Sequence, residues 1–381
     1  MTPFARRTER PIRVLHVSTR AEGGVKVLAE MIDAGLAPHG IVSEHRVLIP
    51  AGAGPKAVLK ACAGTVLALA IGRHDAVFAY QSAASILAGL VGSVRRTRVR
   101  VSHLTALPVG LKARWAGIDR WLGVRGAYTH IIANCEATRR AYAHYPAAYR
   151  ARITTIAHGV TPLCPAPRPR DWRRHLGLPA HTPLLVATGR LAEQKDFATA
   201  IAALPRLPDA HLVIAGEGPL RGALIDRAEA LGVSDRVHLP GNLARETLHA
   251  LVSQADAYVF PSVWESFGLA GAEALMAGTP VIAADLAVLR EVLDLPGLPP
   301  GTARFHPVGD EKGLATQLRA VLNHPPRWGQ RREAARIACA HHAPERMASR
   351  FRDLLVSALR RQAQGDAGRA ISLLWPVKAS R

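Results

Sequence analysis

Two glutamates, Glu265 and Glu273, lie eight residues apart in a segment made otherwise of small and apolar residues, SVWESFGLAGAEALMAGTPVIAAD (262–285). Burying a carboxylate is unfavourable unless a partner replaces its lost hydration. Both side chains are therefore expected to face solvent or a ligand. On a single helix they would be separated by about 12 Å along the axis, whereas hydrolytic carboxylate pairs lie about 5–9.5 Å apart.

A carboxylate accepts two hydrogen bonds at once, which suits the 2′,3′-diol of a ribose better than it suits hydrolysis. The segment FGLAGAEALMA predicts a helix that begins near Gly268 and ends at Gly278. The first amides of a helix lack intrahelical partners and carry the positive end of its dipole, so they attract phosphate or sugar oxygens. The alternative is that Glu273 is an ordinary surface residue of this helix.

Two cations follow another predicted strand. In ATGRLAEQKDF, Arg190 and Lys195 flank a turn that leads into a helix. Positive side chains beside helix N-terminal amides predict a clamp for a diphosphate. The alternative is a pair of solvated loop charges.

The segment AGEGPLRG imitates a dinucleotide-binding fingerprint. Its glycines, Gly216, Gly218 and Gly222, are spaced G-x-G-x-x-x-G, whereas the fingerprint is G-x-G-x-x-G in the first βαβ unit. Pro219 also interrupts the pattern. We therefore predict a plain strand-to-helix turn here.

The first half of the chain offers a second set of candidate residues. In STRAEGGVKVLAE, a strand ends and a helix opens at Gly23 and Gly24, which predicts an anion-binding nest. His103 follows the run RVRVS and is expected in a loop that faces the ligand. A lone histidine in such a position is either a packed side chain or part of a site.

Short apolar runs that alternate with helical patterns must position these residues. Such runs predict buried strands in parallel sheets covered by helices on both faces. We expect an α/β protein with two Rossmann-like, doubly wound domains and a cleft between them. The expected bounds are 1–163 and 164–365, with a tail at 366–381 that packs back on the first domain or contacts lipid. A stiff linker is predicted from Pro162, Pro165, Pro167 and Pro169.

Composition favours a globular protein with a basic first half. Hydrophobic residues make up 49% of the 381 residues, and the formal net charge is +20. Residues 1–165 hold 22 Lys and Arg against 8 Asp and Glu, which indicates an acidic partner or simply an arginine-rich composition. The four scattered cysteines fit a reducing compartment. No early apolar run reaches the length of a spanning helix, so a cytoplasmic protein is expected.

These motifs together resemble retaining glycosyltransferase family 4, of the glycosyltransferase group 1 type. The first half matches more loosely, through HVSTRAEGGVKVLAEMIDAGLAPHG, VSHLT, IANCEATRRAY and ITTIAHGV. The second half carries the resemblance through ATGRLAEQKDFATAIAAL, HLVIAGEGPLRGAL, DRVHLPGNL and ADAYVFPSVWESFGLAGAEALMAGTPVIAAD.

The resemblance implies a GT-B fold whose second domain holds a nucleoside-diphosphate sugar. By position, Arg190 and Lys195 would hold the diphosphate, Glu273 the ribose, and Glu265 the transferred sugar as a catalytic contact. The backbone around that sugar would come from Ser266, Phe267, Gly268 and Leu269. The base would lie near Leu239, Asn242 and Leu243.

On the acceptor side, the resemblance implies a catalytic role for His103, beside the reacting carbon. Gly23 and Gly24 match the family's N-terminal glycine loop. Two departures concern this side: His158-Gly159 replaces a frequent Asn-Gly, and Lys26 stands where a less basic residue is common.

The implied reaction is sugar transfer with retention to a glycan or a lipid-linked acceptor, in polysaccharide or glycolipid synthesis. Cations and helix amides would stabilise the leaving diphosphate. Since no Asp-x-Asp motif is present, no metal is expected, and no cofactor beyond the UDP- or GDP-sugar co-substrate.

Two rival functions are a nucleotide-sugar epimerase of the same architecture and a basic nucleic-acid-binding protein. The second lacks the aromatic-interleaved basic motif that nucleic-acid binding favours, so no nucleic acid is expected as a partner. A membrane hypothesis rests on LKARWAGIDRWLGVRG (111–126), whose Trp121 and Ile118 lie among basic residues. It would make the protein peripheral at the inner face of the membrane. The alternative is a surface helix packed on its sheet.

Overall fold

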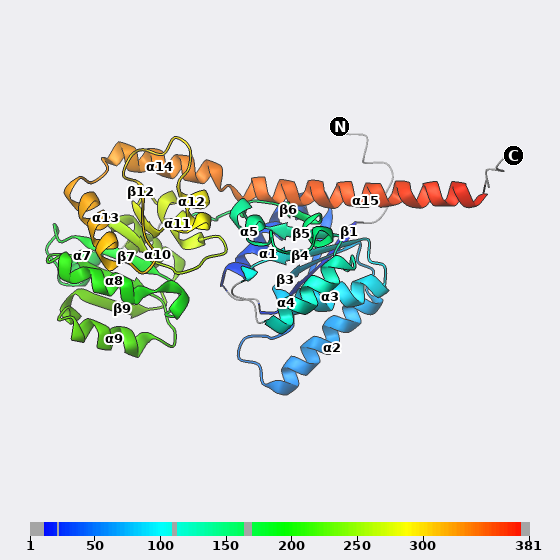
Figure 1. Cartoon of the computed structure of the whole chain (residues 1–381), viewed down its shortest axis with the longest axis horizontal. Coiled ribbons are helices and arrows are strands. Elements are labelled where there is room, and N and C mark those ends of the chain that lie inside the picture. The colour runs from blue at the N-terminus through cyan, green and yellow to red at the C-terminus, as the bar shows by residue number, and fades with distance from the viewer. Residues whose placement is uncertain (1–10, 21–22, 109–112, 164–169, 375–381) are drawn as a thin grey trace. The chain divides into compact units, whose positions relative to one another are not determined.

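The computed structural model describes the backbone of residues 11–20, 23–108, 113–163 and 170–374, and side chains as far as residue 361. The chain divides into two compact units, residues 1–159 with 344–381, and residues 160–343. Each unit is built around a parallel six-stranded sheet (Figure 1). The expected α/β architecture with two doubly wound domains is therefore confirmed.

The first unit has the strand order β2-β1-β3-β4-β5-β6. Its strands are β1 (Ile12–Ser18), β2 (Ile41–Val47), β3 (Ala76–Tyr80), β4 (Val99–Leu104), β5 (His130–Ala133) and β6 (Ile153–Thr155). Its helices are α1 (Gly23–Leu36), η2 (Ala37–His39), α2 (Pro55–Ile71), α3 (Ser82–Val94), α4 (Ala113–Val124), α5 (Glu136–Ala141), α6 (Ala147–Arg150) and α15 (Pro344–Leu374).

Alternate residues of the central strands pack on opposite faces of this sheet, as the two-residue period of a strand requires. On one face, Val14 and Phe78 pack with α1 and with Phe351 of α15. On the other, Leu15 and Val77 pack against α2 and α3. The sheet is therefore covered on both sides, which explains its nearly continuous apolar strands.

The second unit has the strand order β12-β11-β10-β7-β8-β9. Its strands are β7 (Leu184–Thr188), β8 (His211–Ala215), β9 (Val237–Gly241), β10 (Ala257–Phe260), β11 (Val281–Ala284) and β12 (Ala303–His306). Its α-helices are α7 (Trp172–His175), α8 (Phe197–Ala203), α9 (Arg221–Ala230), α10 (Arg245–Gln254), α11 (Leu269–Met276), α12 (Ala287–Leu293), α13 (Glu311–Asn323) and α14 (Trp328–His341), and its 3₁₀ turns are η4 (Glu193–Lys195), η5 (Leu204–Arg206) and η6 (Ser234–Arg236).

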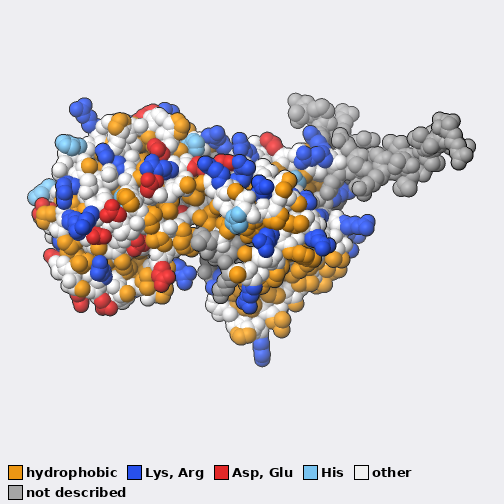
Figure 2. Space-filling view, viewed as in Figure 1, with side chains coloured by type: hydrophobic (Ala, Val, Ile, Leu, Met, Phe, Trp, Pro, Cys, Tyr) orange, Lys and Arg blue, Asp and Glu red, His pale blue; other side chains and the backbone are white. Residues whose placement is uncertain are grey.

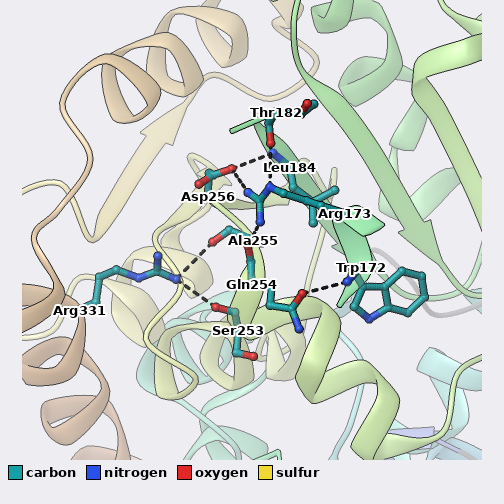
Figure 3. A network of polar contacts seen from close by, with 9 residues as sticks. All are labelled: Trp172, Arg173, Thr182, Leu184, Ser253, Gln254, Ala255, Asp256 and Arg331. Carbon is teal, nitrogen blue, oxygen red and sulfur yellow. Dashed lines mark hydrogen bonds and ion pairs between the residues drawn. The ribbon is translucent and has the colours of Figure 1, made fainter. Parts of the chain in front are cut away.

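Two arginines fasten helices to the amino ends of β7 and β10 (Figure 3). Arg173 of α7 donates to the carbonyls of Thr182 and Gln254 and forms a 2.6 Å ion pair with Asp256. Arg331 of α14 donates to the carbonyls of Ser253, Ala255 and Gly278. Carbonyls at the end of α10 have no intrahelical donor, so the guanidinium groups supply the missing hydrogen bonds.

The domain boundary after residue 343 differs from the predicted one at 365. Residues 344–365 were expected in the second domain, but Met347, Phe351 and Leu355 are buried in the core of the first unit. The physical reason is their four-residue spacing, which gives α15 an apolar stripe that α1 and the sheet cover. Of the predicted tail, residues 366–374 continue α15, and residues 375–381 lie outside the described part of the chain. Three of the four predicted linker prolines, Pro165, Pro167 and Pro169, also lie outside the described part of the chain.

Candidate active site

Two loops at the carboxyl edge of the second sheet carry the main candidate residues. One follows β7 and the other follows β10, and these strands are parallel neighbours. The amide of Val263 donates to the carbonyl of Gln194 at 2.9 Å, and Gln194 Nε2 donates to the carbonyl of Trp264 at 3.1 Å. The two loops therefore hold each other in place.

This cross-linking brings Lys195 and Glu265 together. Lys195 Nζ lies 2.6 Å from Glu265 Oε1, and the two side chains are only 16% and 8% exposed. The Ser262 hydroxyl donates to the same oxygen at 3.0 Å, and the ammonium lies 5.0 Å from the centroid of the Phe260 ring. An ion pair so little exposed is screened weakly by solvent, so each group fixes the position of the other.

Helix α11 begins directly after this pair. Gly268 adopts φ 96°, and an added Cβ would lie 2.5 Å from Leu289 Cδ2, so only glycine fits. Phe267 is buried and meets the His342 ring edge-on at 5.8 Å. The expected helix that begins near Gly268 and ends at Gly278 is confirmed as α11, and its first turn, where helix amides lack i−4 partners, follows Glu265 closely in sequence.

Glu273 lies one turn inside α11 and is mostly buried. Burial raises the pKa of its carboxyl group, and the nearby Arg245 opposes this rise. Arg245 Nη1 lies 3.3 Å from Glu273 Oε1, and Arg245 also donates to the carbonyl of Thr161 at 3.2 Å. Glu273 is thus a partly desolvated acceptor held by one cation, and not the fully exposed residue of the alternative interpretation.

The loops after β7, β8 and β9 are joined by backbone hydrogen bonds. Gly189 donates to Ala215, and Gly216 donates to Gly241. An added Cβ on Gly216 would lie 1.9 Å from the carbonyl oxygen of Gly189. The glycines of AGEGPLRG therefore permit close packing in a strand-to-helix turn between β8 and α9, as predicted.

The remaining donor-side candidates lie on these joined loops. Arg190 is exposed, directly after Gly189. Leu239 is near the end of β9 and half-buried, whereas Asn242, exposed, and Leu243, half-buried, follow the strand. Ser266 and Leu269 flank the turn into α11. The structure thus places all of these residues at the carboxyl edge of one sheet.

In the first unit, His103 is part of β4 and not of a loop. Its backbone pairs with Tyr80 of β3 and Ile132 of β5, so the strand ladder extends past the position where a loop was expected. The side chain is buried, and its ring lies 6.1 Å from that of Phe351. Burial lowers the pKa of His103 to about 3, so its imidazole is neutral at pH 7.

His103 lines a cavity of about 600 Å³ at the carboxyl edge of the first sheet. Within the described residues, its Nδ1 has no hydrogen-bond partner. The cavity is also lined by Val25 of α1, the helix that begins at Gly23 and Gly24. The first-unit candidates are therefore neighbours, and a buried imidazole nitrogen is left for hydrogen bonding.

Asp119 is a cavity residue that the sequence analysis missed. It is buried on α4, and its carboxylate accepts hydrogen bonds from Tyr128 and Tyr149 at 3.0 and 2.7 Å. Burial raises its pKa. In the sequence, Asp119 could have been recognised as the one acidic residue among the apolar residues of WAGIDRWLG. Trp115 of the same segment lines the same cavity.

One comparison with known proteins concerns the second unit. Residues 169–338 match the family model described as glycosyl transferases group 1. This match covers most of the second unit, residues 160–343. A glycogen synthase of Mycobacterium tuberculosis is 38% identical over 190 residues, which cover 49% of this chain and 44% of that protein.

Two further similarities concern most of the chain. A D-inositol 3-phosphate glycosyltransferase of Mycolicibacterium smegmatis is 31% identical over 260 residues, covering 65% of this chain and 59% of that protein. The crystal structure of Anabaena HepE in complex with UDP has a TM-score of 0.73 at 19% identity, covering 91% of this chain and 100% of that one. The chain spans about half the length of the curated relatives it matches. The expected GT-B class, with its two parallel α/β sheets, is confirmed.

Two kinds of feature are absent from the described residues. No group of three or more His, Cys, Asp or Glu side chains in that part is arranged to hold a metal ion. Nor does any helix described there combine the length and hydrophobicity needed to cross a bilayer.

Proposed function

We propose that this protein is a retaining glycosyltransferase that moves a sugar from a nucleoside-diphosphate sugar to a glycan or lipid-linked acceptor. The match to the glycosyl transferases group 1 family model and the similarity to glycosyltransferases support the reaction class. The observation that carries the proposal is the weakly exposed pair of Lys195 and Glu265 at the start of α11. A cation, a carboxylate and free helix amides together match a sugar linked to a diphosphate.

In this proposal each donor group has its own partner. Lys195 and the exposed Arg190 bind the diphosphate, and Glu273 accepts hydrogen bonds from the ribose hydroxyls. Glu265 contacts the transferred sugar, and the backbone of Ser266 to Leu269 lies around it. Leu239, Asn242 and Leu243 lie near the base. The Lys195–Glu265 contact keeps the amine and the carboxylate in position before a donor binds, which lowers the cost of reorganisation.

The chemistry follows from the leaving group. As the bond from the sugar to the diphosphate breaks, negative charge grows on the phosphate oxygens and positive charge on the sugar. Lys195, Arg190 and the α11 amides stabilise the first charge, and Glu265 stabilises the second. We assign His103, neutral and buried, as a hydrogen-bonding partner on the acceptor side. The acceptor proton passes to a phosphate oxygen, and no step uses a metal.

Donor and pathway follow by analogy. The HepE structures are described in complex with UDP, with UDP and glucose, and with UDP-glucose. We propose a UDP- or GDP-sugar donor for this protein, and a role in cell-surface polysaccharide or glycolipid synthesis at the cytoplasmic side of the membrane.

A thermal-shift panel of UDP-, GDP- and ADP-sugars tests the proposal. One of these donors, at about 100 times its Kd, should raise the Tm by roughly 5–10 °C. Glu273→Ala should abolish most of that shift, because the ribose loses its acceptor, while Glu246→Ala, an exposed residue of α10, should retain it. A panel without any shift, or an unchanged shift in Glu273→Ala, contradicts the donor site.

A further inference from the structure

Helices α2 and α3 expose large hydrophobic side chains on the surface of the first unit. Leu59 and Ile71 of α2 are 72% and 67% exposed, and Val94 of α3 is 84% exposed. Figure 2 shows hydrophobic side chains gathered over α2, next to Lys and Arg side chains. Isolated exposed leucines are ordinary, but a contiguous group marks an interaction surface. We define the α2/α3 face as Leu59, Leu67, Ile71, Leu90 and Val94.

The α2 part of this face is one stripe of the helix. Lys56, Leu59, Lys60, Leu67 and Ile71 recur at three- and four-residue intervals, or their multiples, and are all exposed. The opposite side of the helix, with Leu69, packs on the sheet. The apolar residues on the inner side of α2 are therefore part of the core, whereas the apolar residues on its outer side are exposed to solvent and have no packing partner in the core. The two helices pack against each other, which joins their outer sides.

The charged residues of α2, of α3 and of the turns that follow these helices are basic. The sequence contains no Asp or Glu between residues 51 and 74 or between residues 82 and 100. Lys56 and Lys60 lie on α2, Arg73 follows α2, and Arg95 and Arg96 follow α3. A surface that combines apolar side chains with one sign of charge complements an anionic surface that has an apolar interior.

A cavity of about 600 Å³ lies where the two helices end. Within the described residues, the side chains of Arg73, Arg95 and Arg96 in its wall form no hydrogen bond or ion pair. Among the described residues that line it, only Asp75 carries a carboxylate, and this side chain is buried and accepts a hydrogen bond from the amide of Arg13. Guanidinium groups without anionic partners around a cavity are suited to phosphate.

We propose that the α2/α3 face docks on an anionic phospholipid bilayer. The hydrophobic side chains enter the boundary between headgroups and acyl chains, and Arg73, Arg95 and Arg96 bind lipid phosphates. This differs from the surface expected from sequence, α4. There, Ile118 and Trp121 are exposed, but Arg125 already stacks over the Trp121 ring at 5.4 Å, and Asp119 and Leu122 are buried. The proposal does not depend on the sugar-transfer reaction, because binding is measured without donor or acceptor.

Co-sedimentation of the full chain with vesicles tests the charges first. The protein should bind vesicles of phosphatidylcholine with 30–40% phosphatidylglycerol at low salt, and not vesicles of phosphatidylcholine alone. Each basic residue near an anionic surface strengthens binding about fivefold, so removing three should weaken it on the order of 100-fold. The variant is Arg73→Gln/Arg95→Gln/Arg96→Gln. The control variant removes three positive charges from exposed positions of the second unit and is Arg227→Gln/Lys312→Gln/Arg332→Gln.

The apolar contribution is tested separately. Replacing the exposed side chains of α2 should weaken vesicle binding by about tenfold or more, because less apolar surface leaves water. These positions are exposed, so the fold is retained, which the Tm verifies. The variant is Leu59→Ser/Leu67→Ser/Ile71→Ser, and its control at exposed hydrophobic positions of the second unit is Ile225→Ser/Trp328→Ser.

Four outcomes overturn the proposal. The first is that the wild-type protein fails to bind anionic vesicles. The second is that the variants of the α2/α3 face bind vesicles as well as their controls do. The third is a loss of binding in Trp121→Ala but not in the face variants, which would assign the membrane to α4. The fourth is binding of inorganic polyphosphate without binding of vesicles, which would make the cavity a site for a soluble polyanion.

Discussion

Lys195 and Glu265 are held together by a contact that makes each costly to remove alone. When one member of a buried ion pair is deleted, the other charge stays desolvated without a partner, whereas an apolar replacement of both removes that penalty. The pair therefore allows stability and activity to be separated experimentally.

Lys195→Met should lower the free energy of unfolding of the second unit by about 3 kcal/mol. The double variant Lys195→Met/Glu265→Leu should regain most of that stability, since no charge is left unpaired. Its kcat/KM for sugar transfer should nevertheless stay at least about 100-fold below wild type, because the diphosphate has lost its cation. Urea unfolding and nucleoside-diphosphate release measure the two effects. If activity returns with stability, the pair is structural only.

His103 predicts how acid affects the first unit. Its pKa in the folded protein is about 3, against an ordinary value of 6.5. The unfolded chain therefore binds more protons between these values, so this histidine destabilises the fold as the pH falls below 6.5, by up to about 1.4 kcal/mol per pH unit. Above pH 6.5 the effect vanishes.

His103→Gln should flatten this slope between pH 6.5 and 4.5, as measured by hydrogen exchange of the β3 and β4 amides. The exposed His144→Gln in the same unit should leave it unchanged. Because His16 and His158 are also buried with lowered pKa values, part of the slope should persist. Equal slopes in the wild type and His103→Gln would show that its folded-state pKa lies near the ordinary value.

At the scale of elements, the donor site depends on loops that pack backbone to backbone. Gly216 has φ 150°, and its Cα faces the carbonyl of Gly189, the residue before Arg190. A side chain here would push the β7 loop away from the β8 loop. The position of Arg190 is therefore determined partly by a glycine that makes no contact with a ligand.

Gly216→Ala should lower the free energy of unfolding by about 2–4 kcal/mol, because a Cβ adds backbone strain and overlaps the Gly189 carbonyl. It should also reduce the donor-induced thermal shift. Gly222→Ala is the matched control, since a Cβ there meets open space at the start of α9, and it should stabilise by up to about 1 kcal/mol. Urea denaturation compares them. A neutral Gly216→Ala would mean that the loops separate without cost.

Apolar runs in the sequence predicted the inner strands and also the edge strands β6 and β9, but not the edge strands β2 and β12. β1, β3 and β10 are buried at almost every position. In β2, IVSEHRV, four of the seven residues are polar or charged, and only Ile41 is buried. In β12, ARFH, only His306 is buried. Both strands therefore lack the run of apolar residues by which the other strands were predicted.

The sequence was enough to predict where the candidate site residues lie in the fold, but not which of their side chains contact one another. Strand ends and glycine turns, which are visible in the sequence, are enough to predict that Glu265, Glu273 and Lys195 lie at the carboxyl edge of one sheet. That Lys195 pairs with Glu265, and Arg245 with Glu273, depends on distances across β7, β10 and α10. Such distances arise from packing between segments 28 to 70 residues apart in sequence, which local patterns do not encode.

At the scale of the whole molecule, the chain leaves the first unit after Gly159, builds the second, and returns at Pro344. The apolar stripe of α15 was visible in the sequence, but a stripe does not specify which sheet it covers. Proximity along the chain favoured the second domain. The contacts decide otherwise, because Phe351 lies 5.7 Å from Phe78, ring to ring, in the first-unit core.

This return predicts that a C-terminal substitution destabilises the N-terminal unit. Phe351 is 1% exposed, so Phe351→Ala leaves a cavity between α15 and β3 and should lower the free energy of unfolding of the first unit by about 3–5 kcal/mol. Hydrogen exchange should quicken in α1 and β3 and stay unchanged in β7 and β8. Trp328→Ala, which removes an exposed aromatic ring from α14, should change neither unit. The loss of the Phe351 ring destabilises the unit in whose core this ring is packed. Faster exchange in β7 and β8 alone would therefore mean that α15 packs with the second unit.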